Sequence, residues 1–224
     1  MRLSSLAALD GVIGSPESPL GGPRVVRVRD SGMPDEGLWE QLFDVELILE
    51  RLGVAGLNDL AELGCGYGTF TIPVAKRIRG TLHAYDVDEA MAARTKERAA
   101  AAGLANGVVE RRDVLEQGFG LQPRSQDGCL LFNILHHEEP VAILSAAADI
   151  VRPGGRLFVI HWRHDPETPR GPALSIRPRP EQIVGWASES GVLDLARDVV
   201  DMPPWHFGLI FTVTPGRSPL VAEA

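Results

Sequence analysis

The stretch Glu62-Leu63-Gly64-Cys65-Gly66-Tyr67-Gly68-Thr69-Phe70 is the most informative part of this chain of 224 residues. It places three glycines at alternate positions, directly after an apolar strand and directly before a helix. Glycine leaves the backbone bare and tolerates positive φ angles, so a ligand could lie against main-chain N–H groups at the start of the helix. The stretch therefore predicts a ligand-binding turn, with a tight turn that binds nothing as the alternative.

Strands and helices alternate on the C-terminal side of this turn. Asp88 is a good N-cap and Pro140 suits the first turn of a helix, so both mark helix starts. The alternation predicts an α/β fold with a doubly wound, mostly parallel, seven-stranded sheet and helices on both faces. We expect strands at about 58–63, 81–86, 107–112, 127–133 and 156–162, and helices at about 68–79, 88–102 and 139–151.

Both ends of the chain depart from this rhythm. Residues 1–36 are predicted to be an N-terminal arm, mobile or capping the site, before a single domain at 37–224 that opens with a helix at 37–52. Residues 163–180 form a Pro-rich loop before a helix at about 180–190. The last strands, near 196–201 and 207–213, are separated by too few residues for a crossover helix, so we expect a C-terminal antiparallel hairpin.

Composition narrows the class of protein. The formal net charge is −8, from 22 basic and 30 acidic residues, which argues against binding to nucleic acid. Two cysteines cannot make a disulfide framework, so we expect a reduced, cytoplasmic protein. No apolar run approaches the roughly 18 residues of a membrane span. The oligomeric state stays open, with a homodimer as one option.

The residues after the turn indicate which ligand it binds. A dinucleotide-binding turn has a third glycine where this chain has Thr69, which disfavours a nucleotide-dependent oxidoreductase. Asp86 ends the second strand, where a carboxylate can accept both hydroxyls of a ribose. Asp113 ends the third strand, where it could accept from an adenine amine, and Asn133 ends the fourth. Any one of these acids could instead be a helix cap or a solvated loop residue.

These motifs resemble, in order, those of class I S-adenosylmethionine-dependent methyltransferases, and most closely the small-molecule branch with the quinone-biosynthesis enzymes. The resemblance covers about residues 57–162 and implies their Rossmann-like fold. It is carried by Glu62–Phe70, Ala84-Tyr85-Asp86-Val87-Asp88, Arg112-Asp113-Val114, Phe132-Asn133-Ile134-Leu135-His136-His137 and Val151–Leu157.

The resemblance implies a role for each matching residue. The glycines would admit the methionine and ribose of S-adenosylmethionine, with S-adenosylhomocysteine as product, and Glu62 would orient the turn and help bind the ammonium. Asp86 would hold the ribose, Asp113 with the Val114 N–H the adenine, and Asn133 with Ile134 the methionyl end. The whole implied cofactor site is Glu62, Gly64, Cys65, Gly66, Gly68, Asp86, Val87, Asp113, Val114, Asn133 and Ile134.

The acceptor of the methyl group is less visible in the sequence. Asn133-Ile134-Leu135-His136 lacks the two prolines and aromatic residue typical of amine methylases that act on nucleic acids and proteins, so we expect a small-molecule acceptor with an oxygen, carbon or sulfur nucleophile. A non-catalytic binding or regulatory module with the same fold is the alternative. We further expect residues 1–36 and 163–180 to wall the acceptor pocket. Trp162, Trp186 and Trp205 are candidates to line it, with core packing as the favoured alternative for each taken alone.

Histidines are the candidate catalytic residues, because an imidazole can take a proton from a hydroxyl or an activated carbon. His136 and His137 follow the fourth strand at the ligand edge and are preferred, with helix-start or packing roles as the alternative. His161, His164 and His206 flank the Pro-rich loop and the hairpin, which could close over the site. No metal site is predicted, since His136-His137-Glu138-Glu139 has no second group of ligands with regular spacing.

Overall fold

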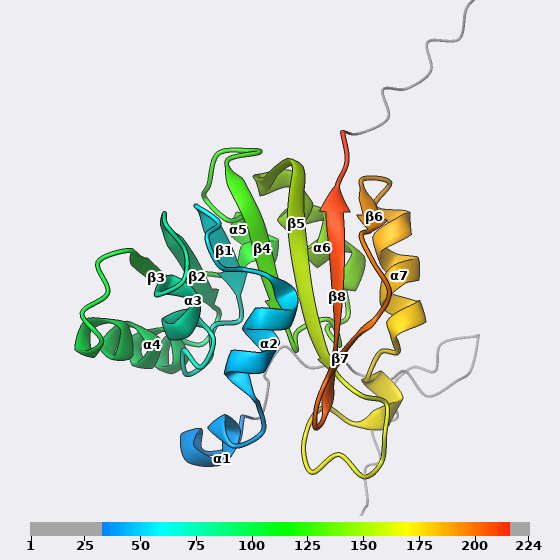
Figure 1. Ribbon diagram of the computed structural model, residues 1–224, viewed down its shortest axis with the longest axis horizontal. Coiled ribbons are helices and arrows are strands. Elements are labelled where there is room, and N and C mark those ends of the chain that lie inside the picture. The colour runs from blue at the N-terminus through cyan, green and yellow to red at the C-terminus, as the bar shows by residue number, and fades with distance from the viewer. Residues whose placement is uncertain (1–32, 216–224) are drawn as a thin grey trace, which may run out of the picture.

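Residues 33–215 are described by a computed structural model, in which one mixed sheet of eight strands runs through the chain (Figure 1). The strand order is β3-β2-β1-β4-β5-β8-β6, and β7 pairs with β8. β1 to β5 run parallel, whereas β8 is antiparallel to β5, β6 and β7. The strands are β1 Leu60–Leu63, β2 Leu82–Asp86, β3 Gly107–Arg111, β4 Gln126–Phe132, β5 Val151–Trp162, β6 Leu193–Leu195, β7 Val200–Met202 and β8 His206–Val213.

Helices cover both faces of this sheet, which confirms the doubly wound α/β fold. Side chains of α2 and α3 form one hydrophobic cluster on one face, where α4 also packs, and those of α5, α6 and α7 form another on the opposite face. The helices are α1 Glu36–Glu40, α2 Val45–Leu52, α3 Thr71–Ala75, α4 Glu89–Ala101, α5 Val114–Gln117, α6 Pro140–Ile150 and α7 Pro180–Glu189, with a 3-10 turn at Leu174–Ile176.

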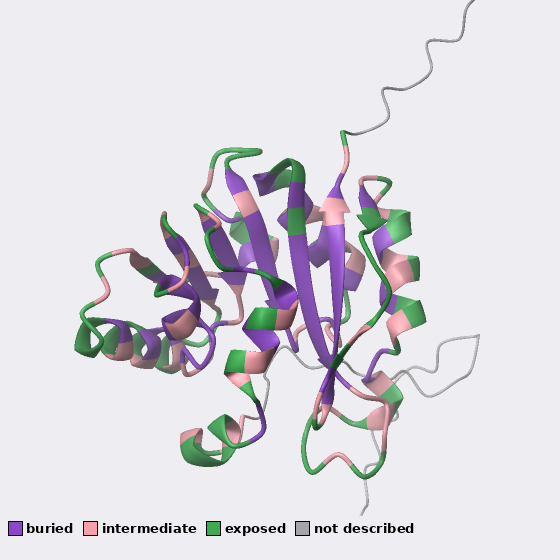
Figure 2. Ribbon diagram, in the orientation of Figure 1, coloured by how far each residue is buried: buried purple, intermediate pink, exposed green. Residues whose placement is uncertain are grey.

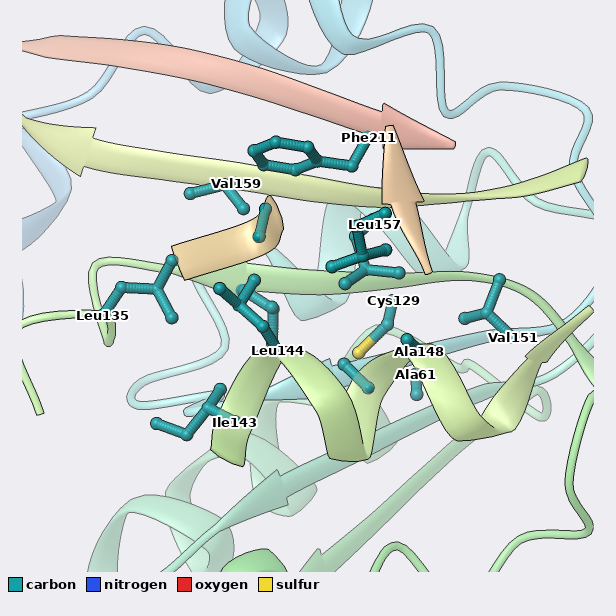
Figure 3. Packing of buried hydrophobic residues seen from close by; sticks show 14 of the residues in the cluster. Ala61, Cys129, Leu135, Ile143, Leu144, Ala148, Val151, Leu157, Val159 and Phe211 are labelled. Atoms are coloured by element: carbon teal, nitrogen blue, oxygen red, sulfur yellow. The ribbon is translucent and has the colours of Figure 1, made fainter. Parts of the chain in front are cut away.

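The central strands are buried on both sides (Figure 2). Figure 3 shows Cys129 and Leu157 of the sheet directed toward Leu144 and Ala148 of α6. Cys129 is fully buried, and burial raises the pKa of its thiol, which suits a packing role. Among the helices that the structure describes, none has the length and apolar character needed to cross a membrane.

Local structure differs from the sequence prediction at several elements. The single helix expected at 37–52 is two, α1 and α2, because the Asp44 side chain accepts from the Leu47 N–H and so starts a second helix. The helix expected at 68–79 is only α3, five residues long. α5 and the three-residue β6 were not expected, and β6 brings the strand number from seven to eight.

The C-terminal hairpin is confirmed. β7 and β8 pair antiparallel, with Met202 opposite His206 around the turn, and the Pro203-Pro204 bond is cis. β5 begins earlier than expected, at Val151, so the segment that was expected to end a helix also pairs with Gln126 of β4. Of the predicted N-terminal arm, residues 1–32 lie outside the described residues. The strand order reverses at β1, between β2 and β4, and open α/β sheets bind ligands at such a switch point.

Candidate functional site

A cavity of about 460 Å³ lies at the carboxyl ends of the central strands. Ten of the eleven residues of the predicted cofactor site line it; Gly68 does not. Met33 and Pro34 contribute from the N-terminal side, and Arg170, Gly171 and Pro172 from the Pro-rich loop, as expected for the described parts of those two segments. The fold therefore gathers the predicted residues around one space of the size typical for small-molecule sites.

The glycine turn is held by hydrogen bonds of its own backbone. All three glycines have positive φ angles, but the N–H groups of Gly64 and Cys65 donate to the Tyr85 carbonyl at 2.8 and 3.0 Å. The Gly66 N–H donates to Asp86, and the Gly68 N–H donates to the Cys65 carbonyl. These four N–H groups are therefore engaged within the protein. The expectation of a ligand against main-chain N–H groups does not extend to these four and stays a prediction for the rest of the turn.

Helix α4 holds this turn through two side chains that do not line the cavity. The Thr95 hydroxyl, fully buried, donates to the Gly66 carbonyl at 2.7 Å, and Arg98 donates to the Tyr67 carbonyl at 3.0 Å. A Cβ on Gly68 would lie 3.1 Å from Thr95, so Gly68 allows this helix to approach. The sequence analysis missed Thr95; its one signal is a β-branched residue in an otherwise Ala-rich, charged helix.

Glu62 is the most perturbed acid of the site. It is 2% exposed, and its Oε2 accepts from the Thr71 hydroxyl at 2.6 Å. Burial raises the pKa of Glu62 to about 8, and the nearby negative charge of Asp86 adds to the shift. A buried carboxyl that ionises at such cost favours a cationic partner in the cavity, which would restore the charged form.

Asp86, the last residue of β2, is the acid whose charge acts on Glu62. One of its carboxylate oxygens accepts from the Gly66 N–H at 2.8 Å and the other from the Asp88 N–H at 3.0 Å. Burial nevertheless raises the pKa of Asp86. Since each carboxylate oxygen has two acceptor sites, these bonds fix the orientation of Asp86 and leave capacity for a ligand's hydroxyls.

Asp113 combines the two roles that the sequence left open. It lines the cavity, and its Oδ1 accepts from the N–H groups of Leu115 and Glu116, which makes it the N-cap of α5. Val114, the first residue of that helix, is buried and also lines the cavity. The cap therefore fixes both residues beside the cavity.

Asn133 has the conformation and the environment of a binding residue. It follows β4 with φ +57°, a left-handed conformation that Asn tolerates better than most residues. Its side chain is 9% exposed, and within residues 33–215 neither its Oδ1 nor its Nδ2 has a hydrogen-bond partner. A buried amide with nothing to bind is costly, so this side chain indicates a polar ligand in the cavity.

The far side of the cavity is aromatic. Phe70 and Phe132 contact edge to face, with ring centroids 4.9 Å apart. Trp39 of α1 contacts Trp162 in the same way, with ring centroids 6.2 Å apart. All four line the cavity. Trp186 and Trp205 do not line it and pack against the hydrophobic clusters, which is the core packing that the sequence favoured for each tryptophan.

Of the histidines, only His136 and His137 line the cavity. The Nδ1 of His137 accepts from the Glu139 N–H at 3.1 Å, so the neutral ring carries its proton on Nε2 and cannot accept a proton there. His164 contacts the Arg177 carbonyl away from this cavity. His161 and His206 are fully buried and do not line the cavity, whereas residues 170–172 of the Pro-rich loop that these histidines flank do line it.

His206 makes stability depend on pH. It stacks on Phe43 with ring centroids 4.5 Å apart, and burial lowers its pKa to about 3. The unfolded chain takes up this proton near pH 6.5, so stability is present above that pH and is lost as the pH falls toward 3. We expect His206→Phe to lose less unfolding free energy than wild type between pH 6.5 and 4.5, as measured by urea denaturation. An unchanged acid slope would contradict this role.

One further buried group organises the Pro-rich loop. The Arg177 side chain, 6% exposed, donates to the carbonyls of Arg163, Arg170 and Pro172 and to the Thr168 hydroxyl. Burial lowers the pKa of Arg177. No pattern in the sequence singles out this arginine, because its acceptors are backbone atoms that only the folded loop brings together.

No group of three or more His, Cys, Asp or Glu side chains suited to a metal ion occurs within residues 33–215.

Two further residues of the predicted cofactor site differ in exposure. Cys65 lies in the glycine turn, lines the cavity and is buried, and burial raises the pKa of its thiol. Val87 lines the same cavity and is 46% exposed.

Comparisons with known proteins agree with this geometry. Residues 60–155 match the family model described as a methyltransferase domain. No curated protein matches the chain by sequence. Among solved structures, a SAM-dependent methyltransferase from Aquifex aeolicus superposes with a TM-score of 0.71 at 23% identity, covering 80% of this chain and 94% of that one.

Two further structures share the fold at lower identity. The N-methyltransferase NodS from Bradyrhizobium japonicum, in complex with S-adenosylhomocysteine, gives a TM-score of 0.61 at 15% identity and covers 80% of this chain and 88% of its own. The [4+2]-cyclase SpnF gives 0.66 at 16% identity, with coverage of 84% and 85%. Residues 60–155 are therefore similar to a methyltransferase domain, and the described chain shares the fold of the S-adenosylmethionine-dependent methyltransferases, which agrees with the resemblance seen in the sequence motifs.

Proposed function

We propose that this protein transfers the methyl group of S-adenosylmethionine to a small-molecule acceptor. The observation that carries the proposal is one cavity lined by Glu62, Asp86 and Asp113 together with Asn133, whose amide has no hydrogen-bond partner within residues 33–215. When bound, S-adenosylmethionine supplies a sulfonium methyl group, and displacement by the acceptor leaves S-adenosylhomocysteine. The narrower likeness to quinone-biosynthesis enzymes stays a prediction.

The residues of the cavity fit this cofactor chemically. Its sulfonium and ammonium are cationic, and the carboxylates of Asp86 and Asp113 would attract such a ligand, with Glu62 ionising as the cation binds. Asp86, fixed by Gly66 and Asp88, would accept the ribose hydroxyls, and Asp113 the adenine amine. Glu62 would receive the ammonium, and the Asn133 amide would bind the methionyl carboxylate or ammonium.

The rest of the cavity would position the acceptor. The walls formed by Trp39 and Trp162 exclude water from the reacting atoms, and alignment of nucleophile and methyl carbon supplies most of the rate. Where the acceptor is a hydroxyl, His136 would take its proton, since the Nδ1 of His137 is already engaged by the Glu139 N–H.

The net charge of −8 supports a small molecule rather than a nucleic acid as the acceptor. The two cysteines, free and buried in the structure, support a reduced, cytoplasmic location. Both statements belong to the proposal, as does the view of residues 1–36 as an arm that caps the site.

The first test is binding of S-adenosylhomocysteine, measured by calorimetry with Asp86→Asn. We expect a loss of affinity of about tenfold to a hundredfold, because a charged acceptor of two hydroxyls becomes a neutral one. Asp88→Asn is the matched control: it removes the same charge at a neighbouring residue of the cavity wall, and Asn serves equally well as N-cap of α4. Equal losses in both variants would contradict the assignment of Asp86.

Catalysis is tested separately from binding. The protein is incubated with S-adenosylmethionine and a panel of phenols, quinols and thiols, and formation of S-adenosylhomocysteine is followed. Turnover of any of them supports the proposal. Tight binding of S-adenosylhomocysteine without turnover of any acceptor would favour a non-catalytic module, and absence of cofactor binding would overturn both.

A further inference from the structure

We propose that the acceptor is an aromatic carboxylic acid, whose ring lies on the aromatic wall of the cavity and whose carboxylate pairs with Arg170. This inference rests on the proposed methyl transfer and adds the class of acceptor to it. It is drawn from the distribution of charge in the cavity, from its aromatic side and from the way in which Arg170 is held.

Charge is divided across the cavity. Glu62, Asp86, Asp88 and Asp113 come from the ends of the first three strands, whereas Arg170 comes from the Pro-rich loop. Among the described residues that line the cavity, Arg170 has the one permanently cationic side chain. An anionic acceptor would be repelled by the four acids and attracted by the guanidinium, so its carboxylate would point away from the cofactor end.

The surface beside Arg170 is suited to a flat ring. Phe70, Phe132 and Trp162 are buried side chains whose edges or faces line the cavity, and Trp39 adds a partly exposed ring. Aromatic pairs prefer offset or edge-to-face arrangements, and the existing pairs here follow that geometry. An aromatic acceptor could extend this cluster.

Arg170 is held by its backbone while its side chain is left exposed. The buried Arg177 guanidinium donates to the Arg170 carbonyl at 3.3 Å and to the Pro172 carbonyl at 2.8 Å. The next residue, Gly171, packs so closely on Trp162 that a Cβ there would lie 2.9 Å from the indole ring. Within residues 33–215, the Arg170 side chain forms no salt bridge, so its charge is available to a ligand.

The test uses protein loaded with S-adenosylhomocysteine and titrated by calorimetry with hydroxybenzoic and hydroxycinnamic acids, each compared with its methyl ester. We expect at least one acid to bind about tenfold or more tightly than its ester, because only the acid forms a charge-assisted pair with Arg170. Arg170→Gln should reduce this preference to less than about threefold, and Arg170→Lys should retain part of it.

Two further measurements separate this role from a general effect on the fold. Arg179→Gln, a nearby arginine outside the cavity lining, should keep the preference for the acid. In methyl transfer to the preferred acid, Arg170→Gln should raise KM with little change in kcat, since the carboxylate is not the reacting group.

The outcomes are distinguishable from failure of the proposed function. Normal affinity for S-adenosylhomocysteine in every Arg170 variant shows that the cofactor site is intact. If esters then bind as tightly as acids, if no acid binds, or if Arg170→Gln keeps the preference, the inference is overturned. Failure of wild-type protein to bind S-adenosylhomocysteine would instead overturn the methyl transfer on which the inference rests.

Discussion

Glu62→Gln will make the ligand-free protein more stable at pH 8 and will also weaken its binding of S-adenosylhomocysteine. The stability gain follows from the raised pKa of Glu62, about 8 in the folded protein against 4.5 in the unfolded chain. The folded state therefore binds an extra proton between these pH values, so this stability is present below pH 4.5 and is lost as the pH rises through 8. Glutamine, neutral throughout, avoids that loss.

The measurement is the free energy of unfolding in urea at pH 5 and pH 8. We expect the difference in unfolding free energy between the variant and wild type to be larger at pH 8 than at pH 5, by on the order of a few kcal/mol in favour of the variant. One pKa unit is worth about 1.4 kcal/mol. Thr71→Val keeps the carboxyl but removes the hydrogen bond that lowers its pKa, so its stability should fall between pH 5 and pH 8 at least as much as that of wild type. If the difference in unfolding free energy between the variant and wild type is the same at both pH values, Glu62 does not have a raised pKa in the folded protein.

The binding half of the prediction concerns the ammonium of the ligand. Ionised Glu62 would pair with it, and Gln offers only a neutral oxygen, so we expect affinity to fall by about tenfold or more at pH 8. Wild-type affinity should also rise between pH 5.5 and 7, because binding releases the proton of Glu62, whereas the variant should lack that rise. Together the two halves describe an acid kept for binding at a cost in stability.

Gly64→Ala will destabilise the protein by about 3 kcal/mol, the sum of two costs. The left-handed conformation, with φ +80°, costs a residue with a Cβ about 1 kcal/mol or somewhat more. The new Cβ would also lie 2.7 Å from the Cγ2 atom of Ile134, and overpacking of this kind typically costs about 1 to 3 kcal/mol. The measurement is chemical denaturation at pH 7.

Gly103→Ala is the matched control for this substitution. Gly103 has φ +67° with no atom within 4 Å of its notional Cβ, so it reports the backbone cost alone. The double variant Gly64→Ala, Ile134→Ala removes the clashing methyl group and should show a favourable coupling energy. Equal destabilisation by the two single glycine variants would show that contact with Ile134 does not limit the site.

The sequence predicted those features that depend on residues close together in the chain. The alternation of strands and helices, the position of the glycine turn, the cap at Asp88 and the cavity positions of Asp86 and Asp113 all follow from local sequence patterns. The break between α1 and α2 was missed, since the apolar positions continue through Asp44 and conceal the side-chain bond that starts the second helix.

Features that depend on distant residues could not be predicted. Nothing local shows that Thr95 reaches the Gly66 carbonyl, or that Arg177 is buried among carbonyls of the preceding loop. His206 looks like an available base in the sequence, yet pairing of β7 with β8 places it between Phe43 and Trp162. His206 was therefore a candidate in the sequence only because the strand pairing that buries it cannot be seen there.

The two outer walls of the cavity are fastened by different forces. On the α1 side, Glu36 and Glu40 pair with Arg94 and Arg98 of α4, through side chains that are 26 to 43% exposed. On the other side, Arg177 binds uncharged oxygens while buried. Salt screens exposed ion pairs far more than buried hydrogen bonds. Higher ionic strength should therefore weaken the contact between α1 and α4 and leave the loop held by Arg177 unchanged. We expect the rate of ligand exchange to rise with salt concentration because the α1 side of the cavity opens more often.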